Sequence, residues 1–310
     1  MKFSNSQILL TGGAGFLGSH VLDELRKKGV DANQVFIPKS DTCDLRRWEN
    51  CVEAVRGRDL VIHLAGHGGG IWYNRRFPGT TFYDNAAMGI QLMQAARIEG
   101  VAKFVTIGTV CAYPKYASSP FKESDLWNGY PEETNASYGL SKKILLVQGQ
   151  AFRQEFGFRS IHLLLANLYG PRDNFDLENS HVVPAMIRKF TEAVDQGLGA
   201  ITLWGSGKAS REFLFVRDAA RGILLAAERY DKPEPVNLGS GSEITIRALA
   251  GLISKLTGFE GVLRWDTSKP DGQPRRHLSV NKARREFGFV AKTGLREGLT
   301  ETIKWYRSLR

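Results

Sequence analysis

Five residues whose side chains can hold or transfer protons follow one another along the chain: Thr109, Cys111, Tyr138, Lys142 and His181. A Tyr–Lys pair with this spacing is suited to hydride transfer at an alcohol or ketone carbon, because the phenol can exchange a proton with the oxygen. A plain reductase has no need of the additional cysteine and histidine. They indicate that a second group moves, most simply a proton on carbon.

Tyr138 and Lys142 are four residues apart, so they share one face of a predicted helix. A phenol is a poor acid–base group at its unperturbed pKa of about 10. A nearby ammonium group stabilises the phenolate, and we therefore expect a lowered pKa for Tyr138. Tyr138 can then protonate the alkoxide that forms when hydride reaches a ketone. Thr109, at the end of a predicted strand, can hydrogen-bond the same oxygen.

Cys111 lies two residues beyond Thr109, so both side chains point the same way if the strand stays extended. An isolated cysteine is most often buried and inert. This one follows the carboxyl end of a strand, the edge that faces the ligand in such sheets, where a thiolate could remove a proton next to a carbonyl. His181 ends a polar loop before a helix. It is either a surface or capping residue, or the acid that supplies a proton on the face of the substrate opposite Cys111.

Gly12, Gly15 and Gly18 form a glycine loop, TGGAGFLG, between a predicted strand and a predicted helix. Glycine permits a tight turn and lets backbone N–H groups approach a pyrophosphate at the helix N-terminus. The loop therefore predicts dinucleotide binding. Further cofactor contacts are expected from Phe16, Leu17, Leu64, Ala65, Gly66, Tyr138 and Lys142.

The end of the second predicted strand distinguishes NAD from NADP. An acidic residue about 20 residues after the glycines would bind the ribose 2′-OH of NAD. Here Lys39 and Ser40 follow the strand, and a cation with a hydroxyl suits a 2′-phosphate. Asp41 complicates this interpretation, and Lys39 could be a plain surface lysine. We favour NADP, with Asp44 and Leu45 as candidates for the adenine edge.

Strand-like and helical segments alternate through the first half of the chain, which predicts a parallel sheet with helices on both faces. The expected strands cover residues 7–11, 35–38, 60–65, 104–109 and 160–167, and the expected helices 20–28, 88–99 and 138–156. The fold class is thus α/β, a doubly wound Rossmann sheet.

The alternation changes after Gly170 and Pro171, which predicts a smaller mixed α/β C-terminal lobe for the substrate. Helices are expected at 183–194 and 218–228, and short strands at 201–204, 213–216 and 236–238. We assign residues 1–168 plus about 212–243 to an NADP-binding domain, and 169–211 plus about 244–310 to a nucleotide-sugar-binding lobe.

Composition narrows the classes of function. The 310 residues carry a formal net charge of +10, which is either a solvated basic surface or an attraction for polyanionic ligands. The basic residues are dispersed in short clusters such as Arg275–Arg276, so nucleic acid is not expected as a partner. No apolar run approaches the ~20 residues of a membrane span, and no signal sequence is evident, so we expect a cytoplasmic protein. Three cysteines make no metal-binding or disulfide pattern, and no metal is expected.

Together these motifs resemble the extended short-chain dehydrogenase/reductase superfamily, and within it the GDP-L-fucose synthase family of 3,5-epimerase/4-reductases. The resemblance runs over nearly the whole chain. It rests on TGGAGFLG at 11–18, GGI at 69–71, CAYP at 111–114, Tyr138-x-x-x-Lys142, NLYGP at 167–171, residues 173–181, WGSG at 204–207, REF at 211–213 and residues 265–272.

The resemblance implies a reductase centre of Thr109, Tyr138 and Lys142, with Cys111 as the epimerisation base and His181 as the acid. It implies conversion of GDP-4-keto-6-deoxy-D-mannose to GDP-L-fucose with NADPH. It also implies homodimers, which we expect to form through the helices near 88–99 and 138–156. The nucleotide-sugar site would be lined by Asn167, His181, Lys189, Trp204, Arg211 and Lys269.

Some positions depart from the family pattern. Thr109 replaces the usual serine, Leu165 and Ala166 replace Pro-Thr, and His67 stands where a lysine is common. Arg217 falls in a segment that usually reads FLHVDD. These departures leave open a sibling 4-ketoreductase or epimerase acting on a different deoxy or heptose sugar.

A 4,6-dehydratase and a non-catalytic protein are both disfavoured. A 4,6-dehydratase would carry an Asp-Glu pair where Val110 and Cys111 stand. A non-catalytic NADP-binding sensor often loses the Tyr/Lys pair or the glycine loop, and both are intact in this chain.

Overall fold

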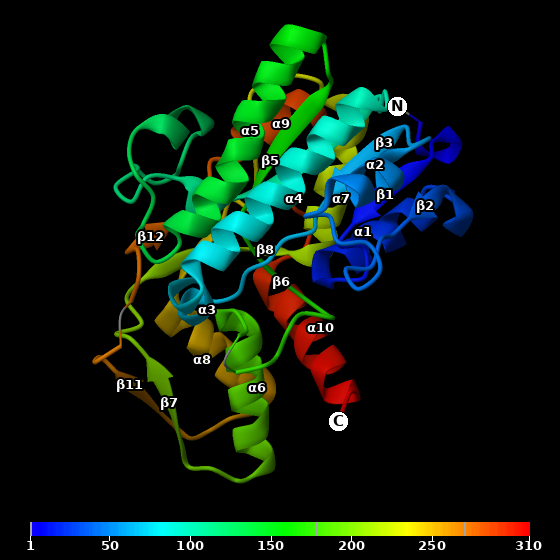
Figure 1. Ribbon diagram of the computed structural model, residues 1–310. Coiled ribbons are helices and arrows are strands. Elements are labelled where there is room, and N and C mark those ends of the chain that lie inside the picture. The colour runs from blue at the N-terminus through cyan, green and yellow to red at the C-terminus, as the bar shows by residue number, and fades with distance from the viewer. Residues whose placement is uncertain (1, 178, 270) are drawn as a thin grey trace.

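A computed structural model describes residues 2–177, 179–269 and 271–310 of the chain. Figure 1 shows two lobes: the larger holds the N-terminal half, and the smaller holds the helices α6 (Val182–Asp195), α8 (Ile246–Thr257) and α10 (Leu295–Ser308). In the described residues, no helix is long and apolar enough to cross a membrane.

The larger sheet consists, in the described part of the chain, of six parallel strands in the order β2-β1-β3-β4-β5-β9. Such an order places successive strands on both sides of β1, as in a doubly wound sheet. The strands are β1 (Ile8–Thr11), β2 (Val35–Phe36), β3 (Leu60–His63), β4 (Lys103–Thr109), β5 (Ser160–Leu165) and β9 (Val236–Leu238).

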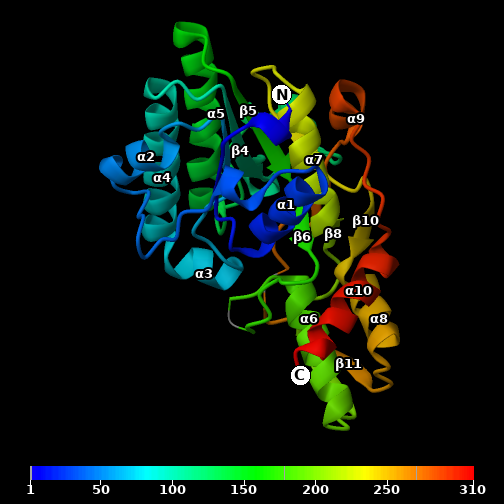
Figure 2. The ribbon, with the colours of Figure 1, turned by 90° about the vertical axis from the view of Figure 1, so that its right-hand side faces the viewer.

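Helices cover both faces of this sheet. Figure 2 shows α2, α4 and α5 on one side of β4 and β5, and α1 and α7 on the other. Short 3-10 turns connect several elements. The helices of this lobe are α1 (Phe16–Lys27), α2 (Trp48–Val55), α3 (Ile71–Arg76), α4 (Pro78–Ile98), α5 (Ala136–Phe156), α7 (Val216–Arg229) and α9 (Asn281–Phe287), and the 3-10 turns are η1 (Phe3–Asn5), η2 (Ala32–Gln34), η3 (Val110–Ala112) and η4 (Glu123–Trp127).

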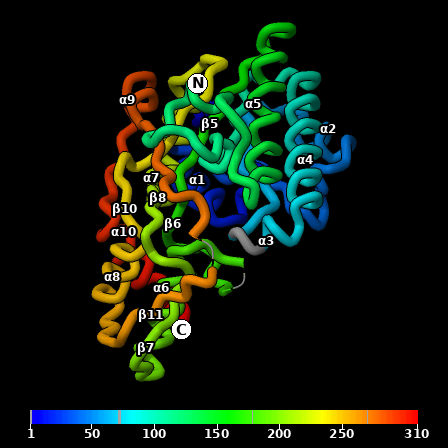
Figure 3. Tube along the Cα trace, turned by 90° about the vertical axis from the view of Figure 1, so that its left-hand side faces the viewer, coloured from blue at the N-terminus to red at the C-terminus, as the bar shows by residue number. Residues whose placement is uncertain are grey.

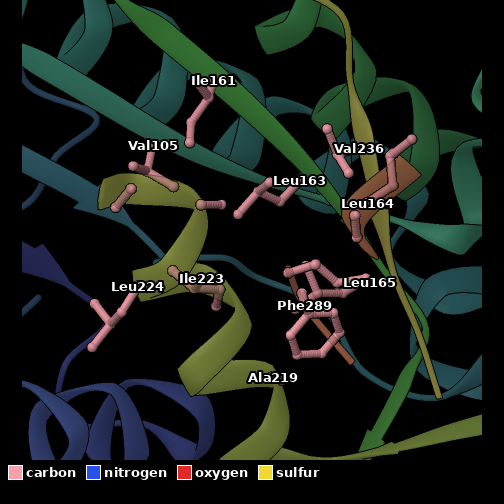
Figure 4. Close-up of a cluster of buried hydrophobic side chains, with 14 of the residues drawn as sticks. Val105, Ile161, Leu163, Leu164, Leu165, Ala219, Ile223, Leu224, Val236 and Phe289 are labelled. Atoms are coloured by element: carbon pink, nitrogen blue, oxygen red, sulfur yellow. The ribbon is translucent and has the colours of Figure 1, made fainter. Parts of the chain in front are cut away.

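The core lies on both faces of the sheet because the strands are buried on both sides. On one face, strand residues such as Val105 and Leu163 pack against Ala219 and Ile223 of α7 and against Phe289 (Figure 4). On the other face, residues of β1, β3 and β4 pack against α2, α4 and α5. The sheet is thereby held rigidly, with its carboxyl edge facing the smaller lobe.

The smaller lobe is built around a mixed sheet in which β8 pairs with β6, β10 and β12, and a separate parallel pair β7–β11. Its own core joins α6, α8 and α10. The elements are β6 (Asn167–Tyr169), β7 (Ala200–Trp204), β8 (Ser210–Phe215), β10 (Glu243–Thr245), β11 (Val262–Asp266), β12 (Arg275–Arg276), α6 (Val182–Asp195), α8 (Ile246–Thr257) and α10 (Leu295–Ser308).

The predicted fold class is confirmed, and the deviations concern element ends. The expected strand 35–38 stops at Phe36, and Pro38 has no N–H to donate to a ladder. The expected helix 88–99 begins ten residues earlier, at Pro78, a residue favoured at the first helical position. The expected strand 160–167 is wrong as one element: β5 ends at Leu165, and Asn167 starts β6 in the other sheet.

Candidate active site

The glycine loop forms a cradle at the N-terminus of α1. Gly12 has a positive φ of 69°, and the N–H of Gly15 donates to the Gly12 carbonyl at 3.0 Å. A Cβ on Gly18 would overlap that same carbonyl oxygen. Gly15 is the N-cap of α1 and offers no side-chain cap, so the first N–H groups of the helix point outward. These features fit a dinucleotide pyrophosphate.

The predicted 2′-phosphate residues lie beside this cradle. Lys39 and Ser40 are exposed in the turn after β2, the strand that pairs with β1. Asp44 is held by the Arg46 guanidinium at 2.9 Å, which keeps the pKa of its carboxyl below the usual range. The Leu45 side chain packs into the core, so of the predicted adenine pair only Asp44 presents its side chain to solvent.

A cavity of about 770 Å³ opens at the carboxyl edge of the larger sheet and is lined by residues of both lobes. Its walls contain all five predicted acid–base residues. The predicted residues lining it are Phe16, Leu17, Leu64, Gly66, Thr109, Cys111, Tyr138, Lys142, Asn167, His181, Lys189, Trp204 and Arg211. Tertiary structure thus brings together side chains from β4, η3, α5, β6, α6, β7 and β8.

Lys269 does not line this cavity but lies near its rim. Its Nζ is 5.6 Å from the centroid of the Trp204 ring, and Lys189 Nζ is 5.9 Å from the same centroid. Trp204 is 62% exposed, Lys269 is exposed and Lys189 is half-buried. A flat aromatic side chain flanked by cations is suited to an anionic ligand that carries a planar ring.

The Tyr138–Lys142 pair lies in the first two turns of α5. Lys142 is 4% exposed, and its Nζ donates to the Ala65 carbonyl at 3.1 Å. Burial lowers the pKa of Lys142 to about 8. Burial, followed by the charge of Cys111, raises the pKa of the Tyr138 phenol in the protein alone. The expected lowering of the Tyr138 pKa is therefore wrong for the protein alone, because desolvation of the buried phenol raises this pKa.

Two glycines before α3, Gly66 and Gly68, allow the loop that contains them to lie close to the Tyr138–Lys142 pair. A Cβ on Gly66 would lie 2.9 Å from Lys142 Nζ, and one on Gly68 would lie 3.3 Å from a ring carbon of Tyr138. Asn85 clamps the residue between them: it accepts from the His67 N–H at 3.0 Å and donates to the His67 carbonyl at 2.6 Å. Larger side chains at 66 and 68 would displace the side chains of Lys142 and Tyr138.

Two buried histidines below this centre belong to no sequence motif. His63 Nδ1 lies 2.8 Å from the Thr11 hydroxyl, and His162 Nδ1 lies 2.7 Å from the Thr106 hydroxyl. Burial, followed by the positive charge of Lys142, lowers the pKa of each imidazole to about 3. Both rings are therefore neutral at physiological pH and add no charge beneath Lys142.

His181 is the N-cap residue of α6 and lines the cavity from the smaller lobe. The residue is exposed overall, but its ring faces walls that desolvate it, and this lowers the pKa of His181 from its ordinary 6.5. The imidazole is consequently neutral at neutral pH, and a negative charge that develops beside it favours its protonation.

Cys111 lies in η3, which begins directly after Thr109, so the strand does not stay extended as far as the cysteine. The Thr109 hydroxyl oxygen accepts from the Cys111 N–H at 3.2 Å. Sequence reasoning missed a charged neighbour of this thiol. The Arg276 guanidinium, from β12, donates to Cys111 Sγ at 3.3 Å. In the sequence, Arg276 is only part of a short basic cluster, and no local signal relates it to a cysteine 165 positions away.

A hydrogen-bonded network, also missed by sequence reasoning, holds the loop that contains His67. His67 Nδ1 lies 2.7 Å from an Asp84 oxygen, and His67 Nε2 lies 2.7 Å from the Tyr73 hydroxyl. Arg46 donates to the other Asp84 oxygen at 3.1 Å. His67, which stands where a lysine is common, thus joins Tyr73 of α3 to Asp84 and Arg46 in one hydrogen-bonded chain.

Residues 8–239 match the model of the NAD dependent epimerase/dehydratase family. The chain belongs to this family. A probable GDP-L-fucose synthase 1 from Oryza sativa subsp. japonica is 39% identical over 304 residues, covering 97% of this chain and 92% of the rice protein. The chain is therefore an enzyme of the epimerase/dehydratase family, similar to GDP-L-fucose synthases.

Solved structures of similar proteins have the same fold over almost the whole chain. A GDP-6-OMe-4-keto-L-xylo-heptose reductase from C. jejuni is 25% identical, with a TM-score of 0.91 over 99% of each chain. A GDP-L-fucose synthetase from Naegleria fowleri bound to NADP is 29% identical, with a TM-score of 0.88 over 98% of this chain and 93% of that one.

Proposed function

We propose that the protein is an NADPH-dependent epimerase/reductase that converts GDP-4-keto-6-deoxy-D-mannose to GDP-L-fucose. The observation that carries this proposal is the shared cavity: the Tyr138–Lys142 reductase pair and the Cys111 and His181 acid–base pair line the same walls. One bound sugar can therefore meet both sets of groups without leaving the site.

In the reduction, a bound nicotinamide would supply the hydride that reaches C4. Tyr138 gives its phenolic proton to the C4 oxygen, while the Thr109 hydroxyl donates a hydrogen bond to that oxygen. Lys142 is the ammonium group whose positive charge compensates the negative charge of the Tyr138 phenolate that is left behind. The high phenol pKa in the protein alone favours the protonated form that this step consumes.

In the epimerisation, the Cys111 thiolate removes a proton from the carbon next to the 4-keto group. The C–H bond breaks, an S–H bond forms, and the electron pair moves to the keto oxygen as an enediolate. His181, once protonated from solvent, returns a proton to the opposite face of the same carbon, so the configuration inverts without net redox change. The ketone is regenerated for the next step.

Substrate binding is assigned to the smaller lobe. Asn167 lies at the start of β6 and donates to the Glu212 carbonyl at 2.9 Å, which orients its amide at the cavity wall. We assign the GDP ring and diphosphate to Trp204, Lys189 and Lys269. Burial lowers the pKa of Arg211 to about 10, so it remains cationic at neutral pH and can bind a sugar or phosphate oxygen.

NADPH is the proposed cofactor because Lys39 and Ser40 stand where an acidic residue would select NAD. The proposed division gives residues 1–168 plus about 212–243 to an NADP-binding domain and 169–211 plus about 244–310 to a nucleotide-sugar lobe, except that α9, within the second range, packs on α7 and β9 of the larger lobe. A homodimer is proposed through α4 and α5, whose outer faces expose Tyr83, Ile90 and Val147.

A second candidate is reduction of a different 4-keto sugar, such as a heptose, attached to GDP. The similarity in fold to the C. jejuni heptose reductase favours it, as does the unusual His67 in the loop beside the cavity. The two candidates differ in the sugar and in whether Cys111 acts, so both are open to one experiment.

That experiment is NADPH oxidation with GDP-4-keto-6-deoxy-mannose, with the product identified by NMR. The wild type is expected to form GDP-L-fucose, and Cys111→Ser to lose the inverted product. Cys43→Ser is the matched control, because Cys43 lies outside the cavity. Consumption of NADPH with C3 and C5 unchanged in the wild type would make the enzyme a simple reductase. No consumption at all would point to another sugar.

A further inference from the structure

The contact between Arg276 and Cys111 has no part in the mechanism given above. Arg276 Nη1 donates to Cys111 Sγ at 3.3 Å, and Arg276 is 8% exposed. A buried guanidinium in contact with sulfur is a charged donor facing a group that is either a neutral thiol or a thiolate. The hydrogen bond is stronger to the thiolate, since both partners are then charged.

The guanidinium is held in this position by its other contacts. Arg276 Nε donates to Gln273 Oε1 at 3.1 Å, and Gln273 Nε2 donates to the Lys115 carbonyl at 2.8 Å. β12 runs parallel to β8, with Arg276 opposite Arg211. Figure 3 shows this orange segment rising from the smaller lobe toward α9 beside the larger one. The contact therefore crosses between the lobes.

Other charged and titratable groups face the thiol from the surrounding elements. Tyr138 of α5 and Arg211 of β8 each interact electrostatically with Cys111. Arg211 is in turn offset by Asp271 and Glu132, two carboxylates that line the cavity. Among these groups of the described chain, Arg276 is the cation in hydrogen-bond contact with the sulfur.

We propose that Arg276 is a positioning residue of the epimerisation: it orients Cys111 Sγ toward the cavity and holds the sulfur as the thiolate. This rests on the proposed role of Cys111 as the base. When the thiolate takes a proton from the sugar carbon, the S–H bond replaces the charged contact, and the positive charge of Arg276 then stabilises the enediolate beside it. Arg276 transfers no proton itself.

The test is the pH dependence of iodoacetamide alkylation of the complete enzyme without substrate. Burial raises the pKa of the Cys51 thiol to about 12 and also raises the pKa of Cys43, so both react slowly near neutral pH. Cys111→Ser gives the remaining background. We compare wild type with Arg276→Gln and Arg276→Lys.

Arg275→Gln is the matched control. Arg275 is the neighbouring residue on the same strand, but its side chain is exposed and paired with Glu243 at 2.6 Å. In Arg276→Gln, the midpoint of the alkylation profile is expected to rise by about one pH unit, with an about tenfold slower reaction at neutral pH. Arg276→Lys should recover part of this loss, and Arg275→Gln should match wild type.

Superimposable profiles for wild type and Arg276→Gln would overturn the proposal, as would an equal shift in Arg275→Gln. If Arg276→Gln does not fold, Gln273→Leu releases the guanidinium without removing its charge. A higher midpoint of the alkylation profile in Gln273→Leu supports the proposal, and an unchanged midpoint overturns it. Because no sugar is present, this result is independent of the proposed substrate.

A second measurement tests whether the Arg276–Cys111 contact affects the proposed epimerisation. Solvent-deuterium incorporation at C3 and C5 of the 4-keto sugar is expected to slow about tenfold in Arg276→Gln, in proportion to the lost thiolate. NADPH oxidation with a 4-keto sugar that needs no inversion should change little. Equal losses in both steps would mean that Arg276 supports the fold or the binding of substrate, and would overturn the specific role.

Discussion

Replacing Lys142 by methionine is expected to stabilise the folded protein while abolishing reduction. Lys142 is 4% exposed, and burial lowers its pKa from 10.5 to about 8. A lowered lysine pKa means that the folded state disfavours the ammonium group relative to water. Methionine has a similar shape and no charge, so the variant avoids this unfavourable burial.

The size of the effect follows from the pKa difference. A difference of about 2.5 pH units corresponds to about 3 kcal/mol of unfavourable free energy in the folded state. The variant also loses the hydrogen bond to the Ala65 carbonyl, which contributes about 1 kcal/mol. The free energy of unfolding of Lys142→Met should therefore exceed that of wild type by about 2 kcal/mol at pH 7.

The stability advantage of Lys142→Met over wild type must decrease as the pH rises. Below pH 8 both folded and unfolded chains carry the Lys142 proton, so the full cost of burying the charge is present. Between about 8 and 10.5 the folded chain releases the proton while the unfolded chain keeps it, so wild type gains stability as the pH rises. The advantage of Lys142→Met should shrink by about 2 kcal/mol between pH 7 and pH 9.5.

The assay is urea unfolding at both pH values, without cofactor, together with NADPH turnover. Lys143→Met is the control: this neighbour donates to the Leu126 carbonyl and stacks 4.0 Å from the Trp127 ring centroid, outside the cavity. It is expected to keep turnover. A Lys142→Met variant that is less stable than wild type at pH 7, or whose advantage does not shrink at pH 9.5, would refute the reasoning.

Three further substitutions test the site. Gly66→Ala places a Cβ 2.9 Å from Lys142 Nζ, and should lower kcat about a hundredfold in steady-state assays with the fold intact by circular dichroism. Gly18→Ala drives a Cβ into the Gly12 carbonyl and should weaken NADPH binding more than about tenfold in calorimetry, while Gly251→Ala, where a Cβ meets open space on α8, should not. Lys39→Glu should shift the NADPH/NADH preference about tenfold toward NADH, measured as kcat/KM for each; an unchanged ratio would show that Lys39 does not contact the 2′-phosphate.

The parallel sheet and the glycine cradle could be predicted because their signals are local. Strand-sized apolar runs alternate with amphipathic segments, and the glycines fall between a strand and a helix. Element ends were less accurate, since they depend on pairing with distant segments. The break at Ala166 shows this: its N–H donates to the Leu238 carbonyl of β9, and the next residue pairs with β8 instead.

The predicted acid–base residues do line one cavity, but their electrostatic state could not be predicted from spacing. The Tyr–Lys pair led us to expect a lowered pKa for Tyr138, whereas burial raises it. Desolvation depends on how completely other elements enclose a group. Here the loop at Gly66 and Gly68 and its clamp, Asn85, provide that enclosure, and none of them belongs to the helix that carries the pair.

The sequence by itself determined which chemical groups are present, their order, and the strand–helix alternation that brings strand ends to one edge. Tertiary structure alone decided which charges meet. Arg276 reaches Cys111 because β12 pairs with β8. Lys142 of α5 interacts electrostatically with neutral His63 of β3 and neutral His162 of β5 because these elements converge. Electrostatic interactions and desolvation depend on distances in space, and those distances are set by packing between segments far apart in the chain.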